Sequence, residues 1–189
     1  MVIGENVDAQ LEPFWEELEV EEYMVDMVLE EDKERVLKFY TDKGENFDSF
    51  EDCYRKYGED WNNNRYKKDK DGVWREYSKY NPDAQWDWYQ IGGRWAGKII
   101  VKEGVKFDAP CFSWGWSQEA IDQRLKERRT DSALLKDIEN IDDSFYTCYA
   151  VLKDGEWISD GGGIDAEKVK DIVSKLSPNT RITFVDCHM

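Results

Sequence analysis

Apolar residues recur at helical spacing in several stretches of the chain. Leu29, Val36 and Phe39 follow a period near 3.6 residues, and Gly44, a common helix stop, comes soon after them. We therefore predict a helix over residues 29–43. The same criteria predict helices over residues 48–58 (capped by Asp48), 117–128 (capped by Ser117) and 164–176, and a short helix over 6–14 that Pro13 limits.

Strand patterns are concentrated after residue 84. Gly92 and Gly93 separate two β-prone runs in the segment 85–101, and such glycines supply the positive φ that a two-residue turn needs, so we expect a hairpin there. Further strands are expected at residues 105–107, 145–152, 156–159 and 181–187. This pattern predicts an α+β fold with a single antiparallel-rich sheet, ferredoxin-like in its simplest form, backed by helices.

The middle of the chain is polar. Residues 61–82 carry the turn signals Asn-Asn-Asn and Asp-Lys-Asp-Gly, so we expect a connection with little regular structure. A length of 189 residues is that of one domain. We expect residues 1–189 to form a single domain, made of an acidic helical part (1–60), a polar connection (61–84) and a sheet-rich core (85–189).

The composition excludes several classes of protein. With 42 acidic and 26 basic side chains the formal charge is -16, which argues against a surface for DNA or RNA. An aromatic content of 14% excludes wholesale disorder. No apolar run approaches the ~18 residues of a membrane span, and no signal segment is evident. We expect a cytoplasmic protein that contacts no membrane.

The acidity is concentrated at the start of the chain. Residues 1–34 hold thirteen acids and a single base, Lys33. One interpretation is a surface that binds a basic partner, and the other is a solvated acidic face that keeps the protein soluble. The residues expected to bind the partner are Glu16, Glu17, Glu19, Glu21, Glu22, Glu30, Glu31 and Asp32.

Basic and aromatic residues alternate between residues 65 and 79. Such interleaving can hold single-stranded nucleic acid, because bases stack on aromatic rings. Asp69 and Asp71 interrupt the run, however, and its net charge is small. We favour a polar connection over a nucleic-acid site.

A group of aromatic residues surrounds the glycine pair. Trp86 and Trp88 would share one face of a strand, and Arg94 and Trp95 follow the glycines directly. These four residues could bind a ligand by stacking on a base and pairing Arg94 with a phosphate. The alternative is a buried aromatic cluster in which Arg94 pairs with Asp87 or another acid. The glycines lack the spacing of a phosphate-binding loop.

The sequence ends in an acid, a thiol and an imidazole. Asp186 and His188 would share one face of a strand, where the carboxylate could orient the imidazole as a general base, with Arg94 as a further catalytic candidate. Cys187 would point to the other face and could not pair with His188. The alternative is a closing strand whose histidine hydrogen-bonds to the core.

Metal and disulfide sites receive little support. His188 is the single histidine, and the cysteines (Cys53, Cys111, Cys148 and Cys187) are widely spaced, so we expect no zinc site and four reduced thiols. We expect no cofactor. An oxygen-ligand site for Mg²⁺ or Mn²⁺ would be sought first at Glu5, Asp8, Asp87 and Asp186.

Four stretches together resemble a known family. They are Gly4–Phe14, Asn81–Trp95 (with the core Trp-Asp-Trp-Tyr-Gln-Ile-Gly-Gly-Arg-Trp), Tyr149–Trp157 and Asp186–Met189. The family is one of bacteriophage, prophage and mobile-element proteins that carry no assigned activity. The resemblance implies a phage-type cytosolic protein. Members have a longer β-prone run before the first stretch, and the acidic region after Pro13 and the segment 45–74 look particular to this chain, so partner specificity is expected there.

Three hypotheses follow for function. The first is an acidic protein that binds and modulates a host protein with a basic surface, such as a defence nuclease, by mimicking nucleic-acid charge. The second is a small enzyme or nucleotide-binding module that uses the tryptophan cluster with Arg94, Asp186 and His188, and it requires Arg94 and His188 to meet at one site. The third is a virion-related structural or accessory protein without a catalytic site, which would form an oligomer or expose a large apolar patch.

Overall fold

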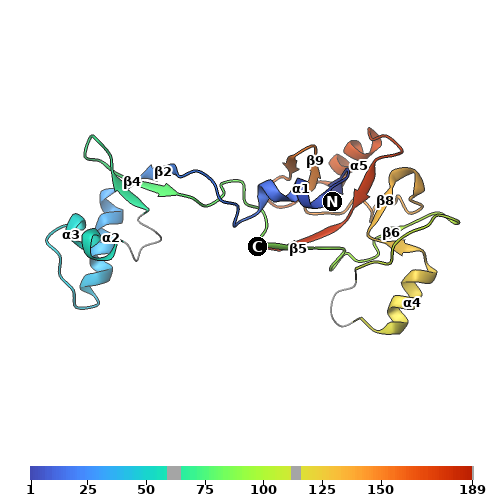
Figure 1. Cartoon of the computed structure of the whole chain (residues 1–189), viewed down its shortest axis with the longest axis horizontal. Helices are drawn as coiled ribbons and strands as arrows, with labels where there is room; N and C mark the ends of the chain where they lie inside the picture. The colour runs from blue at the N-terminus through green and yellow to red at the C-terminus, as the bar shows by residue number, and fades with distance from the viewer. Residues whose placement is uncertain (59–64, 112–115, 189) are drawn as a thin grey trace. The chain divides into compact units, whose positions relative to one another are not determined.

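The computed structural model describes residues 1–58, 65–111 and 116–188, which contain both helices and strands, as predicted for an α+β protein (Figure 1). The backbone divides into two compact units. Unit 1 comprises residues 1–18 and 81–189, and unit 2 comprises residues 19–80. Unit 2 is thus inserted in the chain of unit 1, and its boundaries differ from those expected near residues 60 and 84.

A five-stranded sheet forms the centre of unit 1. β1 (Val2–Ile3) pairs in parallel with β9 (Val151–Lys153) and antiparallel with β11 (Arg181–Thr183). β10 (Glu156–Ile158) and β8 (Ser132–Leu134) flank these strands, so the order is β10-β9-β1-β11-β8. A strand of two residues is stable at this central place because neighbours on both sides share its hydrogen bonds.

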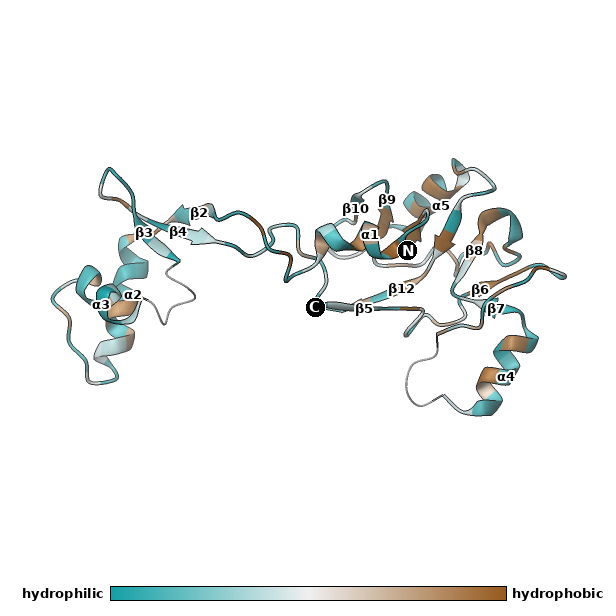
Figure 2. Ribbon diagram, in the orientation of Figure 1, coloured by the Kyte–Doolittle hydropathy of each residue, from teal (hydrophilic) through white to brown (hydrophobic). Residues whose placement is uncertain are grey.

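One face of this sheet packs against the helix α5 (Ala166–Ser174). Ile3 and Ile182 belong to the same buried cluster as Val169 and Val173 of the helix. The ribbon of α5 carries both hydrophobic and hydrophilic residues (Figure 2). The helix predicted over 164–176 is therefore confirmed. It begins after Asp165, whose side chain accepts a hydrogen bond from the backbone N–H of Glu167.

The opposite face of the sheet holds a second, smaller cluster. Val2 and Leu152 point to it, because neighbouring residues of a strand alternate between faces. The short helix α1 (Val7–Leu11), followed by the 3-10 turn η1 (Glu12–Phe14), packs Leu11 against them. Trp86 completes the cluster, and its indole Nε1 donates a 2.9 Å hydrogen bond to the carbonyl of Leu11.

The hairpin expected at the glycine pair is not formed. β5 (Trp88–Ile91), before the glycines, pairs with β12 (Val185–His188), whereas β6 (Ile99–Ile100), after them, pairs with β7 (Arg129–Thr130). Each strand finds its partner far along the chain, so the glycines connect two sheets. The predicted final strand over 181–187 is likewise divided, with β11 and β12 in different sheets.

Two other predicted strands differ from the structure. Residues 105–107 form no strand, although Val105 and Phe107 pack against the core. Of residues 145–152, only the end belongs to a strand, β9. The side chain of Asp142 accepts hydrogen bonds from the N–H groups of Ser144 and Phe145 and holds this part in a turn, although Phe145 is fully buried.

The rest of unit 1 is a helix and a short turn. The helix predicted over 117–128 is observed as α4 (Gln118–Lys126), with Ser117 as its cap. A 3-10 turn, η2 (Leu135–Asp137), follows β8.

The segment where the chain leaves unit 1 contacts the segment where it returns. Trp15 and Trp86 form an isolated parallel bridge, and their rings stack with centroids 6.1 Å apart. Asn81 is 2% exposed, and its Nδ2 donates to the carbonyls of Pro13 and Trp15 at 2.8 and 2.9 Å. These contacts hold the departing and returning segments together at the base of the insertion.

Unit 2 contains a three-stranded antiparallel sheet where a loop was expected. β3 (Tyr66–Lys68) and β4 (Trp74–Ser78) lie within residues 61–82, and β2 (Tyr23–Met27) completes the order β2-β4-β3. The Asp-Lys-Asp-Gly signal is the hairpin turn itself, because Asp69 accepts hydrogen bonds from the N–H groups of Asp71 and Val73, both at 2.9 Å. Residues 61–64 of the expected loop lie outside the described residues.

Two helices cover one face of this sheet. They are α2 (Glu30–Thr41) and α3 (Phe50–Tyr57), so both predicted helices are confirmed. The small core holds Val28, Phe50 and Tyr66, with Val36, Leu37, Tyr54 and Trp74 packed around it. This core is small and largely aromatic.

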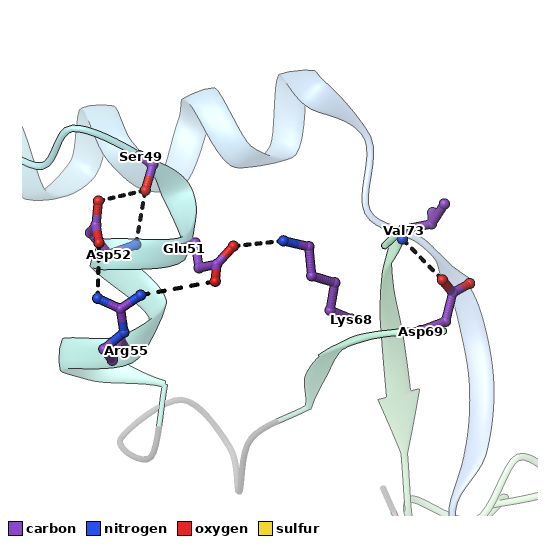
Figure 3. A network of polar contacts seen from close by, with 7 residues as sticks. All are labelled: Ser49, Glu51, Asp52, Arg55, Lys68, Asp69 and Val73. Carbon is purple, nitrogen blue, oxygen red and sulfur yellow. Dashed lines mark hydrogen bonds and ion pairs between the residues drawn. The ribbon is translucent and has the colours of Figure 1, made fainter. Parts of the chain in front are cut away.

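A network of polar contacts joins α3 to the strand β3 (Figure 3). Ser49, rather than Asp48, caps the helix by accepting a 3.1 Å hydrogen bond from the backbone N–H of Asp52. Arg55 reaches Asp52 at 3.1 Å, and Lys68 of β3 bonds to Glu51 at 2.6 Å. The contact between Lys68 and Glu51 links the helix to the sheet.

The described strands therefore form several sheets: one of five strands, one of three and two of two. The single sheet expected from the sequence is not formed, because the strands of residues 66–78 and 88–101 pair with partners outside the main sheet. None of the helices in the described parts of the chain is long and apolar enough to cross a membrane.

Candidate functional site

The glycine pair of unit 1 is enclosed by two buried carboxylates. Gly92 and Gly93 have φ angles of 74° and 54°, which disfavour any other residue. A Cβ atom on Gly92 would lie 2.6 Å from Cγ of Asp131, and one on Gly93 would lie 2.5 Å from Cβ of Asp186. Glycine is therefore required at both positions by backbone conformation and by close approach.

Asp186 binds Arg94 through both of its carboxylate oxygens. Nε and Nη2 of Arg94 donate to Oδ1 at 2.8 and 2.6 Å, and the backbone N–H of Arg94 donates to Oδ2 at 2.9 Å. Burial alone would raise the pKa of Asp186, but these hydrogen bonds and the guanidinium charge lower it below its ordinary value. The carboxylate stays ionised and fixes the Arg94 side chain at the surface.

His188 meets the same carboxylate. Its Nε2 lies 3.4 Å from Oδ2 of Asp186, and its ring stacks on Trp88 with centroids 3.9 Å apart and an 8° angle between planes. Arg94 and His188 thus meet at Asp186, as the second hypothesis requires. Both oxygens of Asp186 are bound by Arg94, and the indole of Trp88 is no nucleophile. Burial raises the pKa of the neighbouring Cys187 to about 11, so its thiol is protonated at neutral pH.

A pocket of about 410 Å³ lies beside this carboxylate, with all of its lining in unit 1. Its floor is a cross-strand row, since Trp157 of β10 pairs with Leu152 of β9, and Leu152 pairs with Val2 of β1. Its rim contains Arg94 and Tyr149, which are well exposed. The full lining is Met1, Val2, Leu11, Gln85, Arg94, Trp95, Tyr149, Ala150, Leu152, Trp157, Val185, Asp186 and Cys187.

The four residues predicted to bind a ligand do not lie together in the structure. Arg94 and Trp95 line the pocket. Trp86 is 8% exposed and belongs to the core, whereas Trp88 is 51% exposed and stacks on His188, so the two do not share a face. Trp86 precedes β5 and does not follow the alternation of that strand.

Sequence reasoning missed the three residues that bring a further amide or aromatic ring to the pocket. They are Gln85, Tyr149 and Trp157, which line it together with Arg94 and Trp95. Gln85, Tyr149 and Trp157 all lie in the stretches that carry the family resemblance. Their place in the same stretches was the signal that sequence offered. The sheet topology that puts residues 94 and 157 in one pocket could not be read from it.

Asp131 is the second carboxylate at the glycine turn. It is 4% exposed and accepts hydrogen bonds from the backbone N–H groups of Gly97 at 2.7 Å and Cys111 at 2.5 Å. Burial raises its pKa, since these two bonds offset the loss of water only in part. Asp131 anchors the turn and the segment before residue 112, so its role is structural.

The eight acids expected to bind a partner are divided between the units. Glu16 and Glu17 belong to unit 1 and the other six to unit 2. Three of the six make ion pairs, Glu22 with Lys67, Glu30 with Lys33 and Asp32 with Arg35. Within the described residues no ion pair is formed by Glu19, Glu21, Asp26, Glu31 or Glu34, so the region around β2 keeps much of its negative charge.

The sheet of unit 2 has a second face that its helices do not cover. Cross-strand pairing places Met24 opposite Tyr77 and Met27 opposite Arg75, with Lys67 beyond Arg75. We call these five residues the methionine face. Met24 and Met27 are 52% and 45% exposed. Nearby Val25 and Leu29 are also largely exposed, so apolar surface extends along β2.

Four of the six cations of residues 65–79 are already paired. Arg65 contacts Glu76, Lys67 contacts Glu22, and Lys68 contacts Glu51. Arg75 bonds to Asp69 at 2.6 Å. Because these positive charges are neutralised by neighbouring acids, they are less available to phosphates, which disfavours a nucleic-acid site here.

The acids proposed for inspection as metal ligands have other partners. Glu5 pairs with Arg181, Asp8 accepts from the hydroxyl of Tyr89, and Asp87 accepts from the backbone N–H of Trp88. Across the part of the chain that the structure describes, no three His, Cys, Asp or Glu side chains are grouped to hold a metal ion. All four cysteines are free thiols.

Comparison with known proteins adds no assignment. No family model, curated protein or solved structure matches this chain. Function is therefore inferred from the pocket of unit 1 and the methionine face of unit 2.

Proposed function

We propose that this protein is a phage-type binding protein that attaches, through the methionine face of unit 2, to a basic surface of a host protein. The observation that carries the proposal is a sheet face with two half-exposed methionines, Met24 and Met27, beside a strongly acidic segment. Residues 19–34 contain eight acids and one lysine, and β2 lies in the middle of them.

The apolar part would supply the centre of the interface. Protein interfaces bury an apolar core inside a polar rim, and methionine suits such cores because its side chain adapts to the partner. Met24 and Met27 lie on the same side of β2 and are about half exposed. Their burial by a partner would remove from water an apolar surface that unit 2 itself leaves open.

The acidic part would select the partner and speed its association. Charges without a partner inside the protein attract a surface of opposite sign and raise the association rate. Glu21 and Asp26 flank Met24 in sequence, and Glu31 follows soon after. In the phage setting that the sequence resemblance implies, the basic surface would be the nucleic-acid channel of a host defence protein.

The edge of β2 favours docking on its face over addition of another strand. A bulge interrupts the register between Met24 and Asp26, and the carboxylate of Asp26 accepts a 2.7 Å hydrogen bond from the N–H of Met27. Bulges and charged residues protect edge strands from pairing. We therefore assign recognition to side chains of the face.

Site-specific photocrosslinking in bacterial cell extract tests this proposal. A photoreactive residue replaces Met24 in one variant and Ile141, an exposed residue of unit 1, in the control. We expect adducts with positively charged proteins from position 24 only. High salt should suppress them, because salt screens exposed charges over about 10 Å at 0.1 M and over shorter distances above that.

A matched pair of charge variants completes the experiment. Replacing Glu21, Glu31 and Glu34 by glutamine should weaken the adducts. Replacing Glu103, Asp108 and Glu119 of unit 1 by the corresponding amides should not. All six side chains are exposed and make no ion pair within the described residues. Equal adducts from positions 24 and 141, or adducts indifferent to salt and to both sets, would refute the proposal.

A further inference from the structure

The pocket of unit 1 has the form of a binding site rather than a packing gap. Its floor residues Val2, Leu11 and Leu152 are at most 2% exposed, whereas Arg94, Trp95 and Tyr149 at its rim are open to solvent. A volume of about 410 Å³ lies in the range of small-molecule sites, about 300–1,000 Å³. A ligand could thus enter from the rim and rest on an apolar floor.

One polar atom of the pocket floor lacks a hydrogen-bond partner. The indole Nε1 of Trp157 is buried and donates to no acceptor within the described residues. Leaving a buried donor unsatisfied costs about 1–3 kcal/mol. Nε1 is covered in this structure, so an acceptor atom on a ligand would remove that cost only after a small movement of the side chains over it, and Trp157 is then the natural contact for a bound molecule.

The charged side chains of the lining neutralise each other. Arg94 and Asp186 are its charged side chains, and they bind each other through three close contacts. The chain as a whole carries a charge of -16, which repels polyanions. A strongly anionic ligand therefore gains little here, and an uncharged one fits better.

The shape and chemistry of the lining favour a planar ring. Trp95, Tyr149 and Trp157 supply three aromatic surfaces, on which heterocyclic bases stack. The amide of Gln85 makes no hydrogen bond within the described residues and can both donate and accept. We propose that this pocket binds an uncharged, acceptor-bearing heterocycle of the nucleobase or nucleoside class, held by Trp157 and Gln85 and stacked at its rim.

This site is independent of the methionine face, because it lies wholly in unit 1. It also differs from the site expected from sequence, since neither Trp86 nor Trp88 lines it. Phosphate binding has no part in it. The proposal can fail while the partner proposal stands, and the reverse.

Titration of the full-length protein with adenosine, uridine, AMP and glucose tests the assignment. The reporter is the indole N–H signal of Trp157 in a nitrogen–proton correlation spectrum, identified with a Trp157→Phe variant. We expect adenosine or uridine to move this signal downfield, AMP to bind more weakly than adenosine, and glucose to have no effect. No shift with either nucleoside, or tighter binding of AMP than of adenosine, would overturn the proposal.

Two variants measure the contributions by calorimetry. Trp157→Phe keeps the ring and removes the donor, so affinity for the nucleoside should fall about 2- to 10-fold. Tyr149→Ala removes a stacking surface at an exposed position and should reduce affinity at least about 5-fold. Tyr80→Ala, an exposed tyrosine of unit 2, is the control and should change nothing. Unchanged affinity in both pocket variants, with normal melting curves, would refute the site.

Discussion

Substitution of Gly92 by alanine should destabilise unit 1 far more than the same change at Gly155. Both glycines lie in unit 1 and have similar φ angles, 74° and 79°. A Cβ on Gly155 meets nothing within 4 Å, whereas one on Gly92 meets the carboxylate of Asp131. The pair therefore separates the cost of the backbone conformation from the cost of the collision.

The magnitudes follow from the contacts of Asp131. A left-handed conformation costs a residue with a side chain about 1–2 kcal/mol, and both variants bear this cost. In Gly92→Ala the carboxylate must also move away from the N–H groups of Gly97 and Cys111. Each hydrogen bond to a charged group is worth about 1.5–3 kcal/mol. We expect the Gly92→Ala variant to lose at least about 2 kcal/mol more than Gly155→Ala.

Urea unfolding monitored by tryptophan fluorescence measures the difference. Seven of the nine tryptophans belong to unit 1, so the signal reports mainly on the unit that carries both substitutions. Removing the carboxylate with Asp131→Ala should lessen the effect of Gly92→Ala, giving a double variant less destabilised than the sum of the two. Agreement of the two glycine variants within about 0.5 kcal/mol, or strict additivity of the double variant, would refute the explanation.

Three further results are expected. The carboxyl carbons of Asp131 and Asp186 should titrate in opposite directions from the ordinary pKa by carbon NMR, with Asp131 above it and Asp186 below it, and Arg94→Gln should raise the pKa of Asp186. Because the pKa of Asp186 is lowered, its favourable contribution to the free energy of unfolding should be complete above about pH 4 and be lost as the pH falls below that. Because the pKa of Asp131 is raised, its ionised form destabilises the fold, and this unfavourable contribution should disappear as the pH falls through that raised pKa. Exposed Cys111 should react with a thiol reagent at pH 8 before Cys187, whose pKa is about 11, as mass spectrometry of the labelled peptides would reveal. Asn81→Ala leaves the carbonyl of Pro13 without a donor among the described residues and that of Trp15 with the N–H of Leu18 alone, and it should cost about 2–4 kcal/mol in urea unfolding, while Asn179→Ala at the surface should cost little.

The helices could be predicted from sequence because their signals are local. The apolar spacing and a cap or stop within a few residues are enough to locate α2, α3, α4 and α5. The errors there are small, such as Ser49 replacing Asp48 as the cap of α3. Strand pairing could not be predicted in the same way, because β5 pairs with β12, which lies almost a hundred residues further along the chain.

The missed hairpin of unit 2 has a different cause. Residues 66–78 are polar because both faces of β3 and β4 carry charged side chains that pair across the sheet or with α3. A hydrophobic pattern cannot reveal such strands. The turn signal between them was correct, but turn residues alone do not distinguish a loop from a hairpin.

The most recognisable motif of the sequence combines residues needed for folding with residues that the fold leaves free. Gly92 and Gly93 are required by the carboxylates packed against them, and the backbone and side chain of Arg94 hold Asp186. Trp95 is 41% exposed at the pocket rim. Because packing explains the glycines but not an exposed tryptophan, the functional content of this motif is expected at Arg94 and Trp95, where the motif meets the pocket.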